Sequence, residues 1–130
     1  MRFTLYGNPA TKKNSQRIIT VNGYPKILPS QAYKFYEKKC LKQIHPSLRR
    51  RIDSPVNVQC LYFMPTRRRV DLANLHSAMH DILVRAGVLA DDNRNIIAGT
   101  DGSRVFYDRE NPRVEIEITP MTDYEQWSRR

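Results

Sequence analysis

The strict alternation between Arg113 and Thr119 is the feature that most narrows what this 130-residue chain can fold into. Val114, Ile116 and Ile118 alternate with charged or polar neighbours, which is the period-two pattern of a strand with one buried and one exposed face. Such a strand needs partners in a sheet and an apolar layer against its buried face. The chain is therefore predicted to contain a sheet that is covered on one side.

Other segments carry the patterns of further strands. Strands are predicted at 2–6, at 56–63 and at 103–107, and a hairpin over 17–28 around the dipeptide Asn22-Gly23. A first helix is predicted to begin after Ser30, a candidate N-cap, and to end before Pro46.

A second helix is predicted over about 71–86, because its apolar residues share one face at the helical spacing and Gly87 suits the position after its end. The expected order is strand, hairpin, helix, strand, helix, strand, strand. It predicts a single α+β domain over residues 1–120, with a mixed β-sheet covered by two main helices. Residues 121–130 are predicted to be a loose C-terminal tail or a subunit contact.

The charge balance narrows the class of partner. There are 22 Lys and Arg residues against 13 Asp and Glu, a net charge of +9, which predicts a polyanionic partner. Basic residues are spread over several segments, including Lys12-Lys13 and Arg49–Arg51, and this favours nucleic acid over a membrane surface. The alternatives are a well-solvated surface without such a partner, or a protein or membrane partner.

The location is expected to be cytoplasmic, with no membrane association. No apolar run approaches the roughly 20 residues of a membrane span, and the first residues lack an apolar leader. Cys40 and Cys60 both sit in patterns that predict burial as free thiols.

Acidic residues are concentrated on and after the second predicted helix. Asp71, Asn74, Ser77 and Asp81 lie along one edge of that helix, and Asp91-Asp92 follows its end. Mg²⁺ and Mn²⁺ bind carboxylate oxygens, and a metal held beside arginines on a basic protein predicts phosphodiester hydrolysis. The three histidines, His45, His76 and His80, are predicted to lie on the surface and not to form a metal set.

Three groups of residues together resemble the RusA family of Holliday-junction resolvases. They are Arg67-Arg68-Arg69-Val70-Asp71-Leu72-Ala73-Asn74-Leu75, then Asp81 with Ala86-Gly87, and then Asp91-Asp92. The resemblance is strongest over residues 60–95. It implies a homodimeric, Mg²⁺-dependent endonuclease, common in phages and prophages, that nicks four-way DNA junctions symmetrically.

The resemblance also assigns roles to residues. Asp71 and Asp92 match the first and the distal acid of the family pattern, and Asn74 matches its Asn. Ala73 stands where the family has a second acid and Ser77 where it has a Lys, and both of those positions are implicated in catalysis. Asp101 is expected to replace the missing acid, with an ordinary Asp-Gly turn as the alternative. Asp81 is expected to be an outer ligand, because it lies more than two turns from Asp71.

The complete expectation is a metal site of Asp71, Asp92 and Asp101, supported by the acid Asp91, that takes Mg²⁺, or Mn²⁺ as a substitute, and no small-molecule cofactor. The residues expected to bind DNA are Lys12, Lys13, Asn14, Arg17, Arg67, Arg68, Arg69, Asn74 and Arg104, with Arg104 replacing the missing Lys. The expected partners are branched DNA and a second copy of the chain. The rival hypothesis is a structure-specific DNA-binding protein that has lost cleavage, which the residues Ala73 and Ser77 favour.

Overall fold

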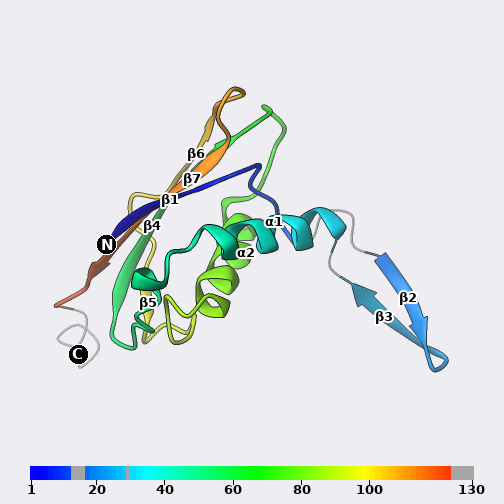
Figure 1. The fold of residues 1–130 in the computed structure, drawn as a ribbon, viewed down its shortest axis with the longest axis horizontal. Coiled ribbons are helices and arrows are strands. Elements are labelled where there is room, and N and C mark those ends of the chain that lie inside the picture. The colour runs from blue at the N-terminus through cyan, green and yellow to red at the C-terminus, as the bar shows by residue number, and fades with distance from the viewer. Residues whose placement is uncertain (13–16, 29, 124–130) are drawn as a thin grey trace.

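A five-stranded mixed sheet forms the centre of the computed structural model, which describes residues 1–12, 17–28 and 30–123 (Figure 1). Its strands are β1 (Arg2–Tyr6), β4 (Val56–Met64), β5 (Ile97–Gly99), β6 (Arg104–Tyr107) and β7 (Arg113–Pro120). β4 lies in the middle of the sheet. It pairs antiparallel with β7, which in turn pairs antiparallel with β1, and along its other side it pairs parallel with β5 and then β6.

The core lies on one face of β4 and β7. Cys60 pairs with Ile116 and Tyr62 with Val114, and all four side chains are buried, as the alternation in both strands requires. The alternate residues of the two strands point to the opposite face and are only partly buried. The prediction of a sheet covered on one side is confirmed.

Two helices cover the apolar face of the sheet (Figure 1). They are α1 (Gln31–Gln43) and α2 (Leu72–Arg85), and a short 3₁₀ helix, η1 (Pro46–Leu48), follows α1. Gly87 has a φ of +78°, the left-handed conformation that suits a residue just after a helix end. The α+β class, the mixed sheet and both helices are therefore as predicted.

The N-cap of α1 is also as predicted, and it supports a first test of stability. The Ser30 hydroxyl accepts a hydrogen bond from the Tyr33 backbone N–H at 3.1 Å, and Ser30 is buried. We expect Ser30→Ala to lower the free energy of unfolding by about 1 kcal/mol in denaturant titrations. The control Ser54→Ala removes an exposed hydroxyl and should change that free energy by less than about 0.5 kcal/mol. Equal effects of the two substitutions would contradict the capping role.

The predicted hairpin forms a separate arm. β2 (Arg17–Val21) and β3 (Tyr24–Leu28) pair with each other and with no other described strand, and the arm projects away from the helices and the main sheet (Figure 1). Asn22 and Gly23 both have positive φ, as a tight two-residue hairpin turn of this type requires.

Two features differ from the sequence predictions. β5 was not predicted, because its three residues are partly buried without alternation and their strand conformation depends on pairing with β4. His76 and His80 are half-buried instead of lying on the surface, and their rings stack on each other with centroids 5.2 Å apart. The His76 ring also packs against Tyr62 on β4, a contact that the helical angle alone did not indicate.

The predictions for the cysteines, the C-terminal tail and membrane-spanning segments compare with the structure as follows. Cys40 and Cys60 are buried free thiols, and burial raises the pKa of each. From residue 124 onward, the predicted tail lies outside the described residues. Among the described residues, no helix combines the length and apolarity needed to cross a membrane.

Candidate functional site

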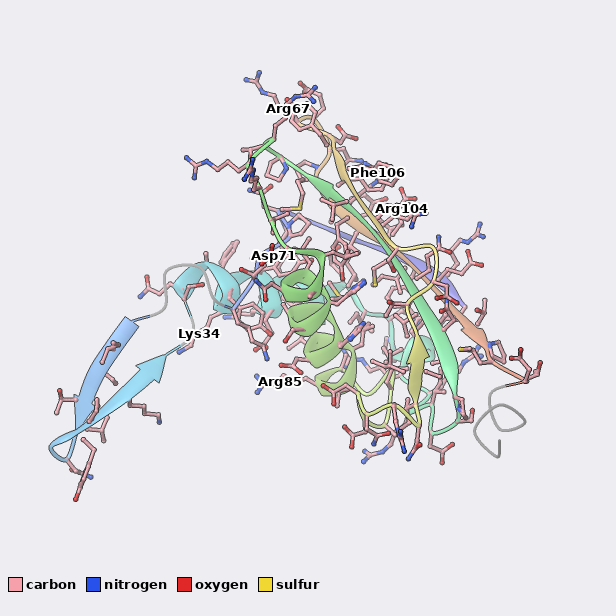
Figure 2. The ribbon with its side chains drawn as sticks, turned by 180° about the vertical axis from the view of Figure 1, so that it is seen from behind. Lys34, Arg67, Asp71, Arg85, Arg104 and Phe106 are labelled. Carbon is pink, nitrogen blue, oxygen red and sulfur yellow. The ribbon has the colours of Figure 1, made fainter. Side chains whose placement is uncertain are left out.

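A cavity of about 540 Å³ lies where α1 and α2 meet the loops that follow β1 and α2. Its lining comes from α1 (Tyr33, Lys34, Glu37), from α2 (Asp81, Val84, Arg85), and from Lys12 and Asp92 in the two loops. Lys34 and Arg85 mark its two helices in Figure 2. The lining contains three carboxylates and three cationic side chains, so the cavity is strongly polar without a net charge.

Ion pairs and hydrogen bonds order most of this lining. Lys12 from the loop after β1 forms an ion pair with Asp81 and lies 5.9 Å from the centroid of the Tyr33 ring. The Glu37 carboxylate accepts a hydrogen bond from the Tyr33 hydroxyl at 3.1 Å and one from the Arg85 guanidinium at 2.8 Å. Burial and then the neighbouring Glu37 raise the pKa of Tyr33, so its hydroxyl stays protonated and remains a donor.

Asp92 differs from the other two acids of the cavity. Asp81 and Glu37 each have a cationic partner, whereas Asp92 forms no ion pair with any described residue. The carboxylate next to it is engaged locally: Asp91 accepts hydrogen bonds from the Asp92 backbone N–H at 2.7 Å and from the Asn93 amide at 3.2 Å. The bond from the Asp92 backbone, then an interaction with the Asp92 side chain, and the bond from Asn93 lower the pKa of Asp91. Asp92 is thus the acid of this cavity with the greatest freedom to act on a ligand.

Asp71 lies at the opposite end of α2 from this cavity. It is the exposed N-cap residue of α2, and its carboxylate accepts a hydrogen bond from the Asn74 side-chain amide at 3.2 Å. Asp81 lies ten positions farther along the chain, a rise of about 15 Å along the helix. The two acids on the polar edge of α2 therefore lie far apart. Asp81, expected as an outer ligand, lines the same cavity as Asp92.

Asp101 is held in a turn beside β4. Its backbone N–H donates to the Asn57 side-chain oxygen at 2.8 Å, and its carbonyl accepts from the Asn57 amide at 3.1 Å. Gly102 follows with a φ of +85°, which suits such a turn. Asp101 is not among the residues that line the cavity.

The expected metal ligands are distributed over both ends of α2 and the turn after β5. In the part of the chain that the structure describes, no three His, Cys, Asp or Glu side chains are arranged to hold a metal ion. Asp71 precedes α2 and Asp92 follows it, and the fourteen residues of α2 span about 21 Å. Within one chain the structure therefore does not bring Asp71, Asp92 and Asp101 into one site.

The residues expected to bind DNA are spread over several loops. Arg67, Arg68 and Arg69 are exposed in the connection from β4 to α2, and Arg104 is exposed on β6. Figure 2 shows Arg67 at the end of the sheet, with Arg104 farther along the same edge. Lys13 and Asn14 lie outside the described residues, and Arg17 is the first residue of β2.

The N-terminal part of the chain has a one-sided charge. Residues 1–36 contain six Lys or Arg residues and no Asp or Glu, so the hairpin arm and the start of α1 carry only positive charge. Such a segment attracts a polyanion over a distance.

Sequence reasoning missed the network around Glu37. The available signal was that Tyr33 and Glu37 are four residues apart on one helix, where side chains meet. The partner Arg85 lies 48 positions away, on α2, and no local pattern joins the two residues. The exposed rings of Phe106 and Tyr107 were also missed as functional candidates.

The comparison with known families agrees with these observations. Residues 7–119 match a protein family described as endodeoxyribonuclease RusA, and the match includes both helices and every residue that lines the cavity. No curated protein matches the chain.

Proposed function

Because the chain belongs to the RusA endodeoxyribonuclease family, we propose that it resolves Holliday junctions or other branched DNA by two symmetric phosphodiester cuts. The family match over residues 7–119 is the observation that carries this proposal. The net charge of +9 and the exposed arginines between β4 and α2 support it, because both favour binding to phosphates.

We propose the cavity between α1 and α2 as the reaction site. Hydrolysis needs a group that accepts a proton from the attacking water, and Asp92, with no ion-pair partner among the described residues, suits that role. We assign Lys12 and Lys34, which line the same cavity, to the phosphate next to the scissile bond. The pairing of Glu37 with Arg85 and Tyr33 fixes the wall that faces them.

We further propose that cleavage requires Mg²⁺, or Mn²⁺ as a substitute, as in the family. A divalent cation would supply charge neutralisation at the phosphate. The donor set of a single chain does not gather into a site for it, so we assign no step to the metal.

A second copy of the chain is the proposed protein partner. A four-way junction must be cut in two symmetry-related strands, and each chain supplies one cavity of this kind. A two-fold symmetric dimer meets that requirement.

Cleavage of a labelled four-way junction and of a matched linear duplex, each with Mg²⁺ and with Mn²⁺, tests the proposal. We expect paired nicks in the junction with at least one of the metals and little cutting of the duplex. Cutting of both substrates at equal rates would contradict the junction specificity.

The second candidate function is a structure-specific DNA-binding protein without cleavage. Ala73 and Ser77 favour it, because both stand where the family has catalytic side chains. Tight junction binding without nicks under either metal would establish this function instead of the first.

A further inference from the structure

A surface of aromatic and basic side chains, all exposed except the partly buried Phe63, lies along the ends of β4 and β6. We call it the sheet-end patch and define it as Phe63, Arg67, Arg68, Arg69, Arg104, Phe106 and Tyr107. Phe106 is 44% exposed and Tyr107 is 42% exposed. Figure 2 shows Arg67, Phe106 and Arg104 in succession along this edge of the sheet. Exposed rings of this size, grouped together, indicate a binding surface.

The rings of the patch are held in place by the sheet. β6 pairs with β4 on one side, which places Phe106 beside Phe63 and Tyr107 beside Met64. The rings of Phe63 and Phe106 stack with centroids 5.2 Å apart. Because residues alternate along a strand, Phe106 and Tyr107 present their rings on opposite faces of this edge.

Cationic groups accompany both faces. The Arg67 guanidinium carbon lies 4.2 Å from the centroid of the Tyr107 ring. Arg104 lies two residues before Phe106 on β6, so it shares the face of that ring. The arginines of the patch form no ion pair with any described residue.

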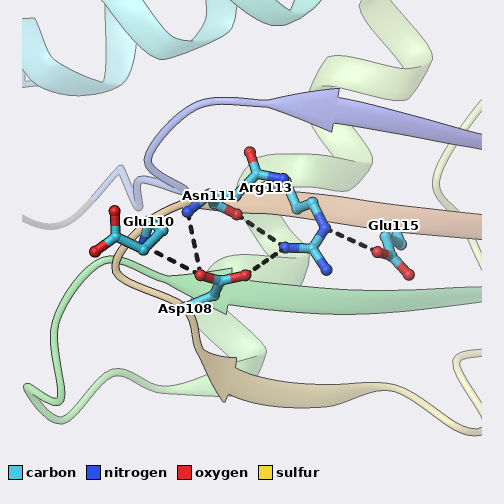
Figure 3. A network of polar contacts seen from close by, with 5 residues as sticks. All are labelled: Asp108, Glu110, Asn111, Arg113 and Glu115. Atoms are coloured by element: carbon cyan, nitrogen blue, oxygen red, sulfur yellow. Dashed lines mark hydrogen bonds and ion pairs between the residues drawn. The ribbon is translucent and has the colours of Figure 1, made fainter.

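Carboxylates near the patch are partly neutralised by another arginine (Figure 3). Arg113 binds Asp108 and Glu115, each at 2.8 Å, and the hydrogen bond from Arg113 is the first cause that lowers the pKa of Asp108. Because one arginine offsets only one of these two charges, the acids of the β6–β7 turn and the start of β7, with Glu110 included, keep two negative charges against the four arginines of the patch. The patch therefore favours a polyanion.

We propose that the sheet-end patch binds unpaired bases at the branch point of DNA, with the arginines on the phosphates and with Phe106 and Tyr107 stacked on bases. This inference rests on the proposed action on branched DNA. Phosphates alone would leave the exposed rings without a role, whereas each base that stacks on an aromatic side chain adds to affinity regardless of its identity. Bases inside a duplex are already stacked, so the rings select open DNA.

A second copy of the chain fits this patch poorly. Two-fold pairing through the edge of β6 would place Arg104 and its neighbours opposite the same arginines of the partner. Like charges facing each other across an interface oppose association. Charge complementarity therefore favours DNA as the occupant.

A four-way junction with 2-aminopurine next to the crossover tests the inference, because stacking on a protein ring changes the fluorescence of that base. The measurement is made in EDTA, so it does not require cleavage. We expect Phe106→Leu and Tyr107→Leu each to reduce the fluorescence change and to weaken binding to single-stranded DNA about tenfold. The affinity of both variants for a linear duplex should stay within twofold of the wild-type value. The control Phe35→Leu removes a 72% exposed ring on α1 and should have neither effect.

Several outcomes would overturn the inference. They are unchanged fluorescence and affinity in both leucine variants, equal losses on duplex and single-stranded DNA, and conversion of a wild-type dimer to a monomer by Phe106→Leu in sedimentation. Thermal unfolding of each variant identifies a loss of binding that comes from misfolding. Because the two variants alter opposite faces of the sheet, each one tests the patch separately. A wild type that stacks on 2-aminopurine but never cleaves would support the patch and refute the nuclease. A wild type that cleaves the junction without changing the fluorescence of 2-aminopurine would support the nuclease and refute the patch.

Discussion

Replacing Asp92 with asparagine is expected to reduce junction cleavage by about 10²- to 10⁴-fold, which is the range for loss of a positioned acid or base. Asparagine has nearly the same shape but cannot accept the proton of the attacking water. Asp92 forms no ion pair with the described residues, so the substitution breaks no such contact and junction binding should change by less than about twofold. Single-turnover cleavage and fluorescence anisotropy measure the two quantities on the same labelled junction.

Two other substitutions make this prediction specific. Asp101→Asn changes an acid that is not part of the cavity, and Asp53→Asn changes an exposed acid on another part of the surface. We expect both variants to cleave within about threefold of wild type. A loss with Asp101→Asn as large as that with Asp92→Asn would show that the two acids act together, and it would contradict the cavity as the complete site.

Strand patterns and helix ends were predictable because they depend on neighbouring residues. The alternation of Val114, Ile116 and Ile118 is a local property, and Ser30 and Gly87 mark helix boundaries through their own backbone and side-chain chemistry. β5 was not predictable in this way. Its strand conformation depends on pairing with β4, about forty residues earlier.

The candidate site could be predicted only in part. Sequence reasoning selected Lys12, Asp81 and Asp92, but it did not pair Lys12 with Asp81, and it expected Asp81 only as an outer ligand. Their meeting depends on how two loops pass the ends of α1 and α2, which is set by tertiary packing. The family pattern also led to Asp71 as a partner of Asp92, and the length of α2 separates the two within one chain.

Lowering the pH from about 6.5 to about 4 is expected to destabilise the folded protein by about 3 kcal/mol through His80 alone. Burial, and then the neighbouring His76, lowers the pKa of His80 from 6.5 to about 4. The unfolded chain therefore binds a proton in this pH range that the folded chain does not. The stabilisation is complete above pH 6.5 and is lost progressively as the pH falls, because protonation favours the unfolded state.

The surroundings of the His80 ring explain why it does not bind a proton in the folded state at these pH values. The Nε2 atoms of His76 and His80 are both buried without a hydrogen-bond partner among the described residues, and the Nδ1 atom of His76 is already bound to the Tyr62 hydroxyl at 2.8 Å. A proton on either ring would place a charge against its stacked neighbour.

Urea unfolding of wild type and of His80→Leu at several pH values between 4 and 7 measures this contribution. The difference in unfolding free energy between the two proteins should shift by about 3 kcal/mol in favour of the variant as the pH falls from 6.5 to 4, because leucine cannot be protonated. His80→Gln should show the same shift even if its packing is poorer at every pH. Ser77→Ala, on the exposed side of the same helix, should keep the pH profile of wild type. Parallel profiles for wild type and both His80 variants would place the pH dependence elsewhere in the protein.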